Sequence, residues 1–464
     1  MLLNGPPPIV ETAFGPDNSQ NRSNTVKNTL VFQKRNPSPV LMKNYELSSN
    51  SNLLEYLDEF KKADYVSKFI GSKSDFNLGK PHLELFSGLS ESIFSKKKVS
   101  KLTFYKDWSY KKYLEAKDLN SILRALVYNN ASNSLSQIEY IIHQNLSRNS
   151  DLSIENNYVL IESFSDYVNM ILVDIGIRQC YGGAAKSDAE FCNAVELLLN
   201  QPLSFGEKNI SHLLKFRLIN RKSNYERGRD YIRDFVLTGK FKQLNKNSLD
   251  ENECLASLLL KKQKELGFPN DIFYTSLPGY FCLFVTLIGH PLSNFFIDIS
   301  LNPSVFKKLE NEQRKLIAKY GNVLTTKQLQ KMVYLDAAIT ETLRFSTNNL
   351  SMKLSLCDIY LPNGVLLPKG SFTKFNIITH NRSSDVFLNH PHDYIPERHF
   401  ILGTKLDVTS KTNLAWGLER QCSYKKYASL FMKLFIASVI RKYEVSQKNK
   451  NNEAEHGGIY DFKP

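Results

Sequence analysis

From Ile272 to Ile297 the chain carries no charged residue, and the segment Tyr280–Gly289 is strongly apolar. An apolar stretch of this length fits either a membrane span or the interior of a large folded domain. Five residues that disfavour a regular membrane span interrupt it, namely Pro278, Gly279, His290, Pro291 and Asn294. We therefore expect a buried helix at about 280–300 rather than a transmembrane segment.

Apolar residues recur at helical spacing through most of the chain after residue 50. The expected helices are 120–128, 135–146, 158–180, 230–237, 280–300, 305–320, a helix from 326 through 343, and 425–443. Alternating residues and two proline-glycine turns predict a small β region at 351–377, with further β structure near the C-terminus. The expected fold class is mainly α with a small β portion. Residues 1–50 are rich in Pro, Asn and Ser and predict a loose segment, followed by one large domain at 51–464.

The 464-residue chain has a formal net charge of +14, which favours acidic partners such as an anionic membrane surface or an acidic protein. Nucleic acid is the weaker choice, because the basic residues are scattered and no nucleic-acid-binding module appears. The six cysteines include no C-x-x-C pair, which argues against a structural zinc site and a disulfide framework. A reducing compartment fits this cysteine usage.

Glu341 and Arg344 are three residues apart on the helix expected after Thr326, so their side chains lie on one face and can pair. The spacing alone is common among surface residues. Arg398 follows in the segment Tyr394–Phe400, and its planar guanidinium could share the Glu341 carboxylate. The alternative is a turn with one exposed ion pair. Together the three residues predict a buried ion network that pins a loop to a helix.

Cys422 precedes the last expected helix, which begins at about Lys425. The helix dipole and free backbone N–H groups at that end favour a thiolate over a thiol. A thiolate is the form in which cysteine binds iron as an axial ligand. A buried small residue is the alternative for a lone cysteine before a helix.

These features occur in the order found in the C-terminal half of the cytochrome P-450 family. The chain resembles that family over about 280–445, and more weakly from about 155 to 270. The matching residues are Glu341, Arg344, Pro368-Lys369-Gly370, His380, Asn381-Arg382, Val386-Phe387, His390-Pro391, Pro396-Glu397-Arg398 and Cys422. Residues 341–346 and 415–417 are similar to the branch that contains steroid 7α-hydroxylases and prostacyclin synthase. The resemblance implies a cytochrome P-450-like fold with haem b as cofactor.

Within this resemblance, Cys422 is the proximal ligand of the haem iron, and Glu341, Arg344 and Arg398 form the structural ion network. Arg420 stands where the family has a basic residue directed at a haem propionate. Trp416 stands for the aromatic residue of the haem loop if one residue is deleted. Lys112, four residues after Trp108, has the spacing of the family's W-x-x-x-R helix, whose members also reach a propionate; an exposed surface lysine is the alternative.

The sequence departs from the family pattern on both sides of the expected haem. Without a gap, Ala415 and Leu418 occupy the usual Phe and first Gly positions, and Tyr424 replaces the Gly two residues after the cysteine. On the opposite side, the position of the family's proton-delivering Thr falls near Leu287, and Thr286 and Ser293 are the nearest hydroxyls. The catalytic residue is therefore unknown. His380, His390 and His392 could suggest a metal site, but His390-Pro391-His392 lacks a zinc-like set of partners and loop histidines beside proline are usually solvated.

The first functional hypothesis is a haem-dependent monooxygenase that inserts one oxygen atom from dioxygen into a small lipophilic substrate, with electrons from a reductase. The absent Thr favours an alternative, a haem-thiolate isomerase or dehydratase, and a non-catalytic family member is the third. An electron donor is expected to dock on the last helix near some of Lys425, Lys426 and Lys433, with Arg441 and Lys442 further along; a solvated basic helix face is the alternative. Location at the endoplasmic reticulum membrane surface or in the cytoplasm follows from the resemblance, with possible peripheral membrane contact; Gly5–Pro8 looks like the hinge that follows a membrane helix.

Overall fold

A computed structural model of the chain describes residues 65–98, 117–199, 224–346, 352–445 and 459–460, with short gaps inside these ranges. The expected loose segment 1–50 and the hinge at Gly5–Pro8 lie outside the described residues. The chain forms two compact units, and each is built from three separate stretches of sequence. The first contains 297–308 and 333–425 together with the N-terminal strands, and the second contains 107–296, 309–332 and 426–464.

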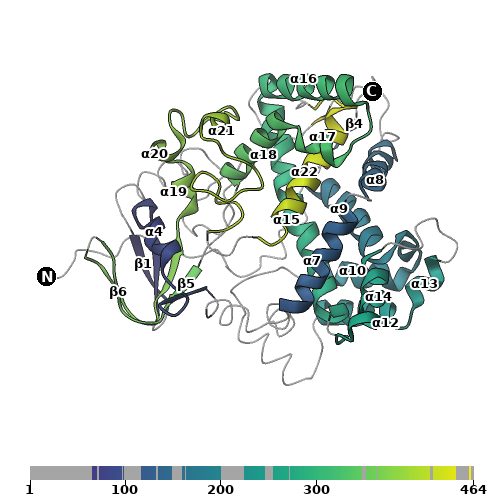
Figure 1. Ribbon diagram of the computed structural model, residues 1–464, viewed down its shortest axis with the longest axis horizontal. Coiled ribbons are helices and arrows are strands. Elements are labelled where there is room, and N and C mark those ends of the chain that lie inside the picture. Colours follow the sequence, from purple (N-terminus) through teal and green to yellow (C-terminus); the bar gives the residue numbers. More distant parts are fainter. Residues whose placement is uncertain are drawn as a thin grey trace. The chain divides into compact units, whose positions relative to one another are not determined.

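The first unit is built on a five-stranded sheet with the order β1-β2-β8-β5-β3 (Figure 1). The strands are β1 (Tyr65–Ile70), β2 (Lys73–Leu78), β3 (Phe94–Ser95), β5 (Met352–Ser355) and β8 (Phe372–Phe375). All neighbouring strands are antiparallel except β2 and β8, which are parallel. A hairpin of β6 (Ile359–Tyr360) and β7 (Leu366–Leu367) lies outside this sheet. The predicted β region thus supplies four strands, and the N-terminal strands complete the sheet.

An apolar cluster packs against this sheet and includes Phe76, Phe86, Phe94 and Phe375. The remaining elements of the first unit are helices and the loops between them. They are the 3-10 helix η1 (Lys80–His82), α4 (Leu83–Gly88), α18 (Val333–Ser346), α19 (Ile377–Asn381), α20 (Ser384–Phe387) and α21 (Arg398–Ile401). Helix α18 has Asp336 in its first turn and Arg344 in its last, so both charges interact favourably with the helix dipole.

The second unit is helical (Figure 1). Its helices are α7 (Lys117–Ala131), α8 (Leu135–Arg148), α9 (Phe164–Tyr181), η3 (Gly183–Ser187), α10 (Ala189–Leu199), α12 (Asn224–Leu237), α13 (Lys240–Asn245), α14 (Leu255–Leu266) and α17 (Thr326–Gln330). Most of α15 (Leu277–Leu301), α16 (Pro303–Tyr320) and α22 (Lys425–Ile440) also belongs to it. A pair of short strands, β4 (Val159–Leu160) and β9 (Ile459–Tyr460), is antiparallel and provides the β structure expected near the C-terminus.

Helix α15 is the buried helix predicted from the uncharged stretch, and it follows one turn of π-helix at Ile272–Ser276. Among the described residues it alone is long and apolar enough to cross a membrane, but 72% of its most apolar window is buried inside the protein. Helix α9 crosses it at two glycines. A Cβ atom on Gly176 would lie 2.8 Å from the Phe281 ring, and one on Gly289 would lie 2.2 Å from Asn169 Oδ1.

Several predicted helix boundaries are wrong, and α12 begins at Asn224 rather than 230. Helix α9 begins at Phe164 rather than 158, because Val159 and Leu160 pair with β9 as strand β4. The single helix expected from Thr326 is two helices. Lys331 ends α17 with its backbone N–H directed to the Gln328 carbonyl, and α18 begins at Val333.

Candidate functional site

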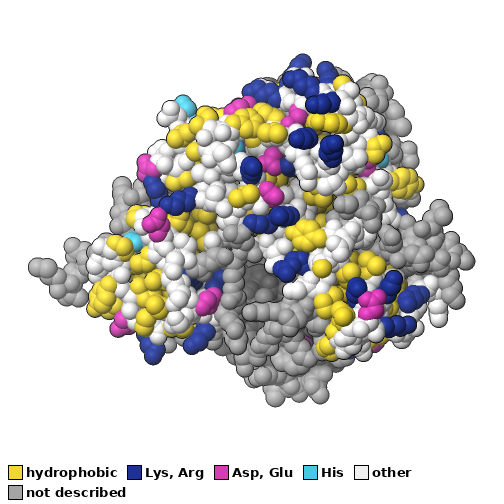
Figure 2. Space-filling view, viewed as in Figure 1, with side chains coloured by type: hydrophobic (Ala, Val, Ile, Leu, Met, Phe, Trp, Pro, Cys, Tyr) yellow, Lys and Arg dark blue, Asp and Glu magenta, His cyan; other side chains and the backbone are white. Residues whose placement is uncertain are grey.

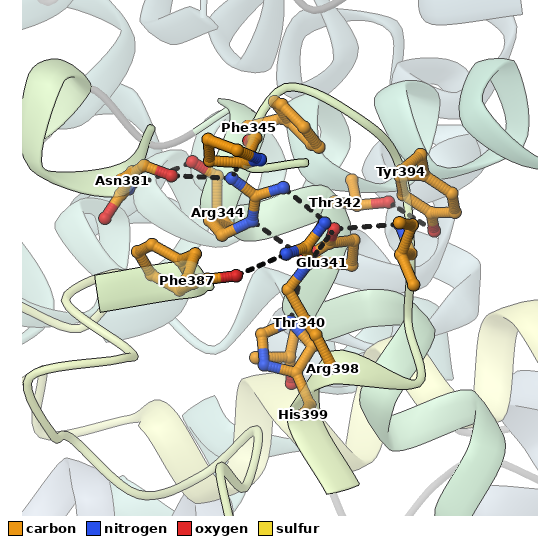
Figure 3. A network of polar contacts seen from close by, with 12 residues as sticks. Thr340, Glu341, Thr342, Arg344, Phe345, Asn381, Phe387, Tyr394, Arg398 and His399 are labelled. Carbon is orange, nitrogen blue, oxygen red and sulfur yellow. Dashed lines mark hydrogen bonds and ion pairs between the residues drawn. The ribbon is translucent and has the colours of Figure 1, made fainter. Parts of the chain in front are cut away.

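Glu341 lies on α18 with no exposed surface, and its carboxylate is the centre of a polar network (Figure 3). Arg344 donates to it through Nε at 2.8 Å and Nη2 at 2.8 Å, and Arg398 donates through Nε at 3.0 Å. The structure therefore brings together the three charged residues that the sequence singled out. The Arg344 pair has the two-pronged geometry that makes arginine–carboxylate contacts strong.

Two further groups donate hydrogen bonds to the Glu341 carboxylate, and the sequence did not identify either of them. His399 Nε2 lies 2.9 Å from Oε2, and the backbone N–H of Ile395 donates to Oε1 at 2.9 Å. Burial alone would raise the pKa of Glu341, but the hydrogen bonds and charge of Arg344 and His399 outweigh it and lower this pKa to about 2. Glu341 is thus a permanent anion at neutral pH.

The guanidinium groups also bind the backbone of the loop that precedes α21. Arg398 donates to four carbonyl oxygens, those of Phe387, Asn389, His390 and Asp393. Arg344 donates to the carbonyl oxygens of Asn381, Pro391 and Asp393. The network therefore fixes the course of residues 387–395 against α18, as the sequence suggested.

Glu397 takes no part in this network. Its carboxylate accepts a hydrogen bond from Tyr334 at 2.8 Å and pairs with Lys308 at 2.5 Å. This contact joins α21 to the first residues of α16 and α18, all within the first unit.

The histidines that could have suggested a metal site are separate. His380 is buried and its Nε2 lies 2.7 Å from the Lys411 carbonyl oxygen. His390 is exposed and lies 3.5 Å from Asp393. In the part of the chain that the structure describes, no group of three or more His, Cys, Asp or Glu residues could hold a metal ion. His390 and His392 are both exposed.

Cys422 lies in the first unit, in the turn that leads into α22. All six cysteines are described, none forms a disulfide, and Cys422 is exposed. Its backbone N–H donates to the Trp416 carbonyl oxygen at 2.8 Å, and its own carbonyl accepts from the Lys425 N–H at 3.2 Å. A loop closed by these bonds fixes the backbone at the cysteine.

The surroundings of the thiol act on its pKa in opposite directions. Desolvation by neighbouring protein atoms raises the pKa of Cys422, whereas a hydrogen bond from the Tyr424 backbone and the charge of Lys425 lower it. The net shift is upward, so the helix end does not by itself favour the thiolate as expected. A bound metal cation would reverse the balance, because a coordinating thiol loses its proton.

The other residues expected at the cofactor are only partly described. Trp416 is half-buried, and its indole N–H donates to the Leu406 carbonyl oxygen. Arg420 lies in the gap at 419–421, and Trp108 and Lys112 lie in the gap at 99–116, so all three are outside the described residues.

In the second unit, α15 has Leu287 at the position of the family's threonine, with 61% of its surface exposed. The Thr286 hydroxyl donates to the Cys282 carbonyl at 2.8 Å, and the Ser293 hydroxyl donates to the Gly289 carbonyl at 2.9 Å. Both hydroxyl protons are therefore engaged within the helix itself.

Only part of the basic face expected on α22 is exposed: Lys426 and Lys442 are exposed and Lys425 is half-buried. Lys433 is buried at 8% exposure. Arg441 donates to Gln313, Gln328 and the Asn322 carbonyl, because α22 packs against α16 and α17 at this end. Lys and Arg side chains also cluster over α16 and α17 (Figure 2). The exposed cations of these two helices are Lys307, Lys308, Arg314, Lys315, Lys319 and Lys327.

The chain is similar to proteins of one family by three comparisons. The family model described as Cytochrome P450 matches residues 207–459. Cytochrome P450 3A18 of Rattus norvegicus is 25% identical over 249 residues, which cover 52% of this chain and 48% of the relative. Cytochrome P450 4d1 of Drosophila melanogaster is 31% identical over 168 residues, covering 34% and 31% of the two chains.

These alignments span about half or less of the length of the curated relatives. Among solved structures, retinoic acid bound cyanobacterial CYP120A1 superimposes with a TM-score of 0.64 at 15% identity, covering 87% of this chain and 93% of that chain. This similarity confirms the predicted mainly helical, cytochrome P-450-like fold. Because the family model covers more than half of the sequence, the chain belongs to the cytochrome P450 family.

Proposed function

We propose that this chain is a haem-dependent monooxygenase that inserts one oxygen atom from dioxygen into a small lipophilic substrate, with electrons supplied by a reductase. The observation that carries the proposal is the free, exposed thiol of Cys422 in a hydrogen-bonded turn at the start of α22. Members of the family bind haem iron, so the prediction of haem as cofactor is confirmed at the level of the family.

The described residues around Cys422 fit a thiolate ligand. Desolvation raises the pKa of the free Cys422 thiol, but the hydrogen bond from the Tyr424 backbone to the sulfur and the positive charge of Lys425 both favour the anion that iron binds. In a metal-bound thiolate this backbone hydrogen bond would moderate electron donation by the sulfur. When bound, haem supplies the oxygen chemistry, and the chain's own residues hold and orient it. We infer that Cys422 is the iron ligand, that Trp416 borders the cofactor, and that Arg420 and Lys112 reach its propionates.

One observation favours the isomerase or dehydratase alternative. The Thr286 and Ser293 hydroxyls of α15 donate to carbonyls of their own helix, so neither offers its proton elsewhere in this arrangement. A reaction that needs no proton delivered to dioxygen is compatible with this helix. Product formation without dioxygen or reductant would distinguish the alternative from the monooxygenase.

The positive charge of the chain supports the proposed electron-donor partner and the proposed membrane contact. An acidic electron donor would be steered by the exposed cations of α16 and α17 in a chain of net charge +14. The same charge suits peripheral contact with an anionic membrane. Branch membership near the 7α-hydroxylases and prostacyclin synthase stays a prediction.

Replacing Cys422 with Ala tests the proposed ligand. We expect the parent to give the strongly red-shifted absorption band of a thiolate-ligated ferrous haem with carbon monoxide, and the variant to lose it. Cys357→Ala is the matched control, because Cys357 is also free and exposed. Haem binding by the parent without that band would exclude Cys422 as ligand.

A further inference from the structure

The backbone of Leu406 is held from both sides within the first unit. Its N–H donates to Asp336 Oδ1 at 2.9 Å. Its carbonyl oxygen accepts from the Trp416 indole N–H and from Asn413 Nδ2, the latter at 3.0 Å. The Leu406 side chain has no exposed surface. Since its donor, its acceptor and its side chain are all engaged, the position of this residue is strongly determined.

Asp336 connects this residue to the helix of the ion network. It lies in the first turn of α18, five residues before Glu341. Its contact with the Leu406 N–H is charge-assisted and therefore stronger than a neutral hydrogen bond. The segment around Leu406 is thus tied to the same helix that the two guanidinium groups hold.

Trp416 carries the connection on to Cys422. Its side chain binds Leu406, and its backbone carbonyl accepts the Cys422 N–H at 2.8 Å. Gly417 follows with φ of 96°, a left-handed conformation that a side chain would strain. Trp416 is therefore fixed at its ring and at its backbone, and the cysteine amide is bound to the fixed part.

We propose that Asp336, acting through Leu406 and Trp416, is a positioning residue that sets the direction in which the Cys422 sulfur points. The proposal rests on the proposed function, in which Cys422 ligates the haem iron. Asp336 touches neither sulfur nor cofactor in this account. It orients the Leu406 peptide, which orients the Trp416 indole, and the Trp416 carbonyl then holds the cysteine backbone.

Three variants test the chain of contacts in the haem-loaded protein. Asp336→Ala removes the acceptor for the Leu406 N–H, and Trp416→Phe removes only the indole donor and part of the ring. Asp336→Asn keeps an acceptor oxygen at the same place and should therefore restore the contact with the Leu406 N–H. Asp407→Ala is the control, since Asp407 is a neighbouring carboxylate outside this chain of contacts.

The measured quantity is the ratio of thiolate-ligated to other ferrous carbon monoxide complexes, at a temperature where each variant is folded. Losing a charge-assisted hydrogen bond should lower this ratio about tenfold in Asp336→Ala. Trp416→Phe should lower it in the same direction, whereas Asp336→Asn and Asp407→Ala should resemble the parent. A merely structural role would lower the melting temperature and leave the ratio of the folded protein unchanged, and that result would overturn the proposal.

Amide hydrogen exchange of the peptide containing Leu406, in the chain as purified, tests the Asp336 contact separately from the proposed role of Cys422 as haem ligand. Faster exchange in Asp336→Ala is expected, and unchanged exchange would overturn the proposal whatever the spectrum shows. A second outcome combines faster exchange in the variant with a parent that never gives the thiolate band. It would confirm the contact between Asp336 and Leu406 but reject the proposed function on which the positioning role rests. If Asp336→Ala cannot be purified, Trp416→Phe decides by the carbon monoxide ratio, and an unchanged ratio in the folded variant would overturn the proposal.

Discussion

At the scale of single residues, the loop pinned by the two arginines contains backbone that is unusual for side-chain-bearing residues. Leu388 has φ of 62° and ψ of −151°, a region that is occupied essentially by glycine, and His390 has φ of 56°. Arg398 binds the carbonyls of Phe387 and Asn389, on either side of Leu388, and that of His390 itself. The guanidinium contacts therefore hold strained backbone in place.

Glycine at position 388 should stabilise the protein. Leu388 is 44% exposed, so its removal sacrifices little packing, and relief of the strain is worth about 1–2 kcal/mol. The measurement is the free energy of unfolding in urea for Leu388→Gly and for Leu388→Ala. Alanine loses the same side-chain contacts but retains the strained Cβ, so only glycine should stabilise. Equal values for both variants would contradict the strain.

The carboxylate of Glu341 predicts a defined acid sensitivity. Its pKa falls from an ordinary value of 4.5 to about 2 in the folded chain. A lowered folded-state pKa gives stability that is fully present above pH 4.5 and is lost as the pH falls towards 2. The shift corresponds to about 3 kcal/mol. Unfolding free energies measured between pH 6 and pH 2.5 should decline in this window.

Glu341→Gln is the control for that measurement, because it removes the titrating group and keeps the shape. The variant should be less stable than the parent at pH 6, with a smaller decline between pH 5 and 2.5. An equal decline in both proteins would assign the acid sensitivity to other carboxylates.

Which of these residues could be predicted from the sequence depends on what they contact. Glu341, Arg344 and Arg398 were predictable because charged side chains at diagnostic spacing pair with one another. His399 was not, although it adjoins Arg398, because a histidine gives no signal of its partner. The contacts of Asp336 and Trp416 are made to the backbone of Leu406, and any residue can supply a backbone group.

At the scale of elements, apolar periodicity predicted most of the long helices, whereas alternation predicted only strands β5 and β8 of the five-stranded sheet. Helices α8, α15 and α16 begin and end within three residues of their predicted bounds, because helical packing repeats locally. Strands β1, β2 and β3 were not predicted, since their partners lie far along the chain. The pairing of β4 with β9 likewise replaced one end of a predicted helix.

Because α9 and α15 pack closely where they cross, we expect alanine in place of glycine there to destabilise the protein. Alanine normally stabilises a helix interior by about 1 kcal/mol relative to glycine. At Gly176 the new Cβ would lie 2.8 Å from the Phe281 ring, so Gly176→Ala should lower the melting temperature instead. Gly88→Ala is the control, because nothing lies within 4 Å of a Cβ there. A stabilised Gly176→Ala protein would show that the two helices separate at little cost.

At the scale of the whole molecule, each compact unit is assembled from stretches that are distant in sequence. The family and the mainly helical fold could be predicted because the diagnostic residues lie together in the C-terminal half. The division into two units could not, since no linker or change of composition marks where the chain passes from one to the other. Sequence patterns report local structure, and this division is made by contacts between remote segments.

The parallel pairing of β2 with β8 imposes an order on synthesis. Asp75 is aligned with Phe372, so the N-terminal strands leave the ribosome long before the strand that completes their sheet. At about 5–20 residues per second, roughly 300 intervening residues take about 15–60 s to make. During that interval the open edge of β2 and the apolar side chains of Phe76 and Leu78 have no sheet to join. The hairpin therefore stays unpaired at this edge until translation is nearly finished, and a chaperone would shield it in that time.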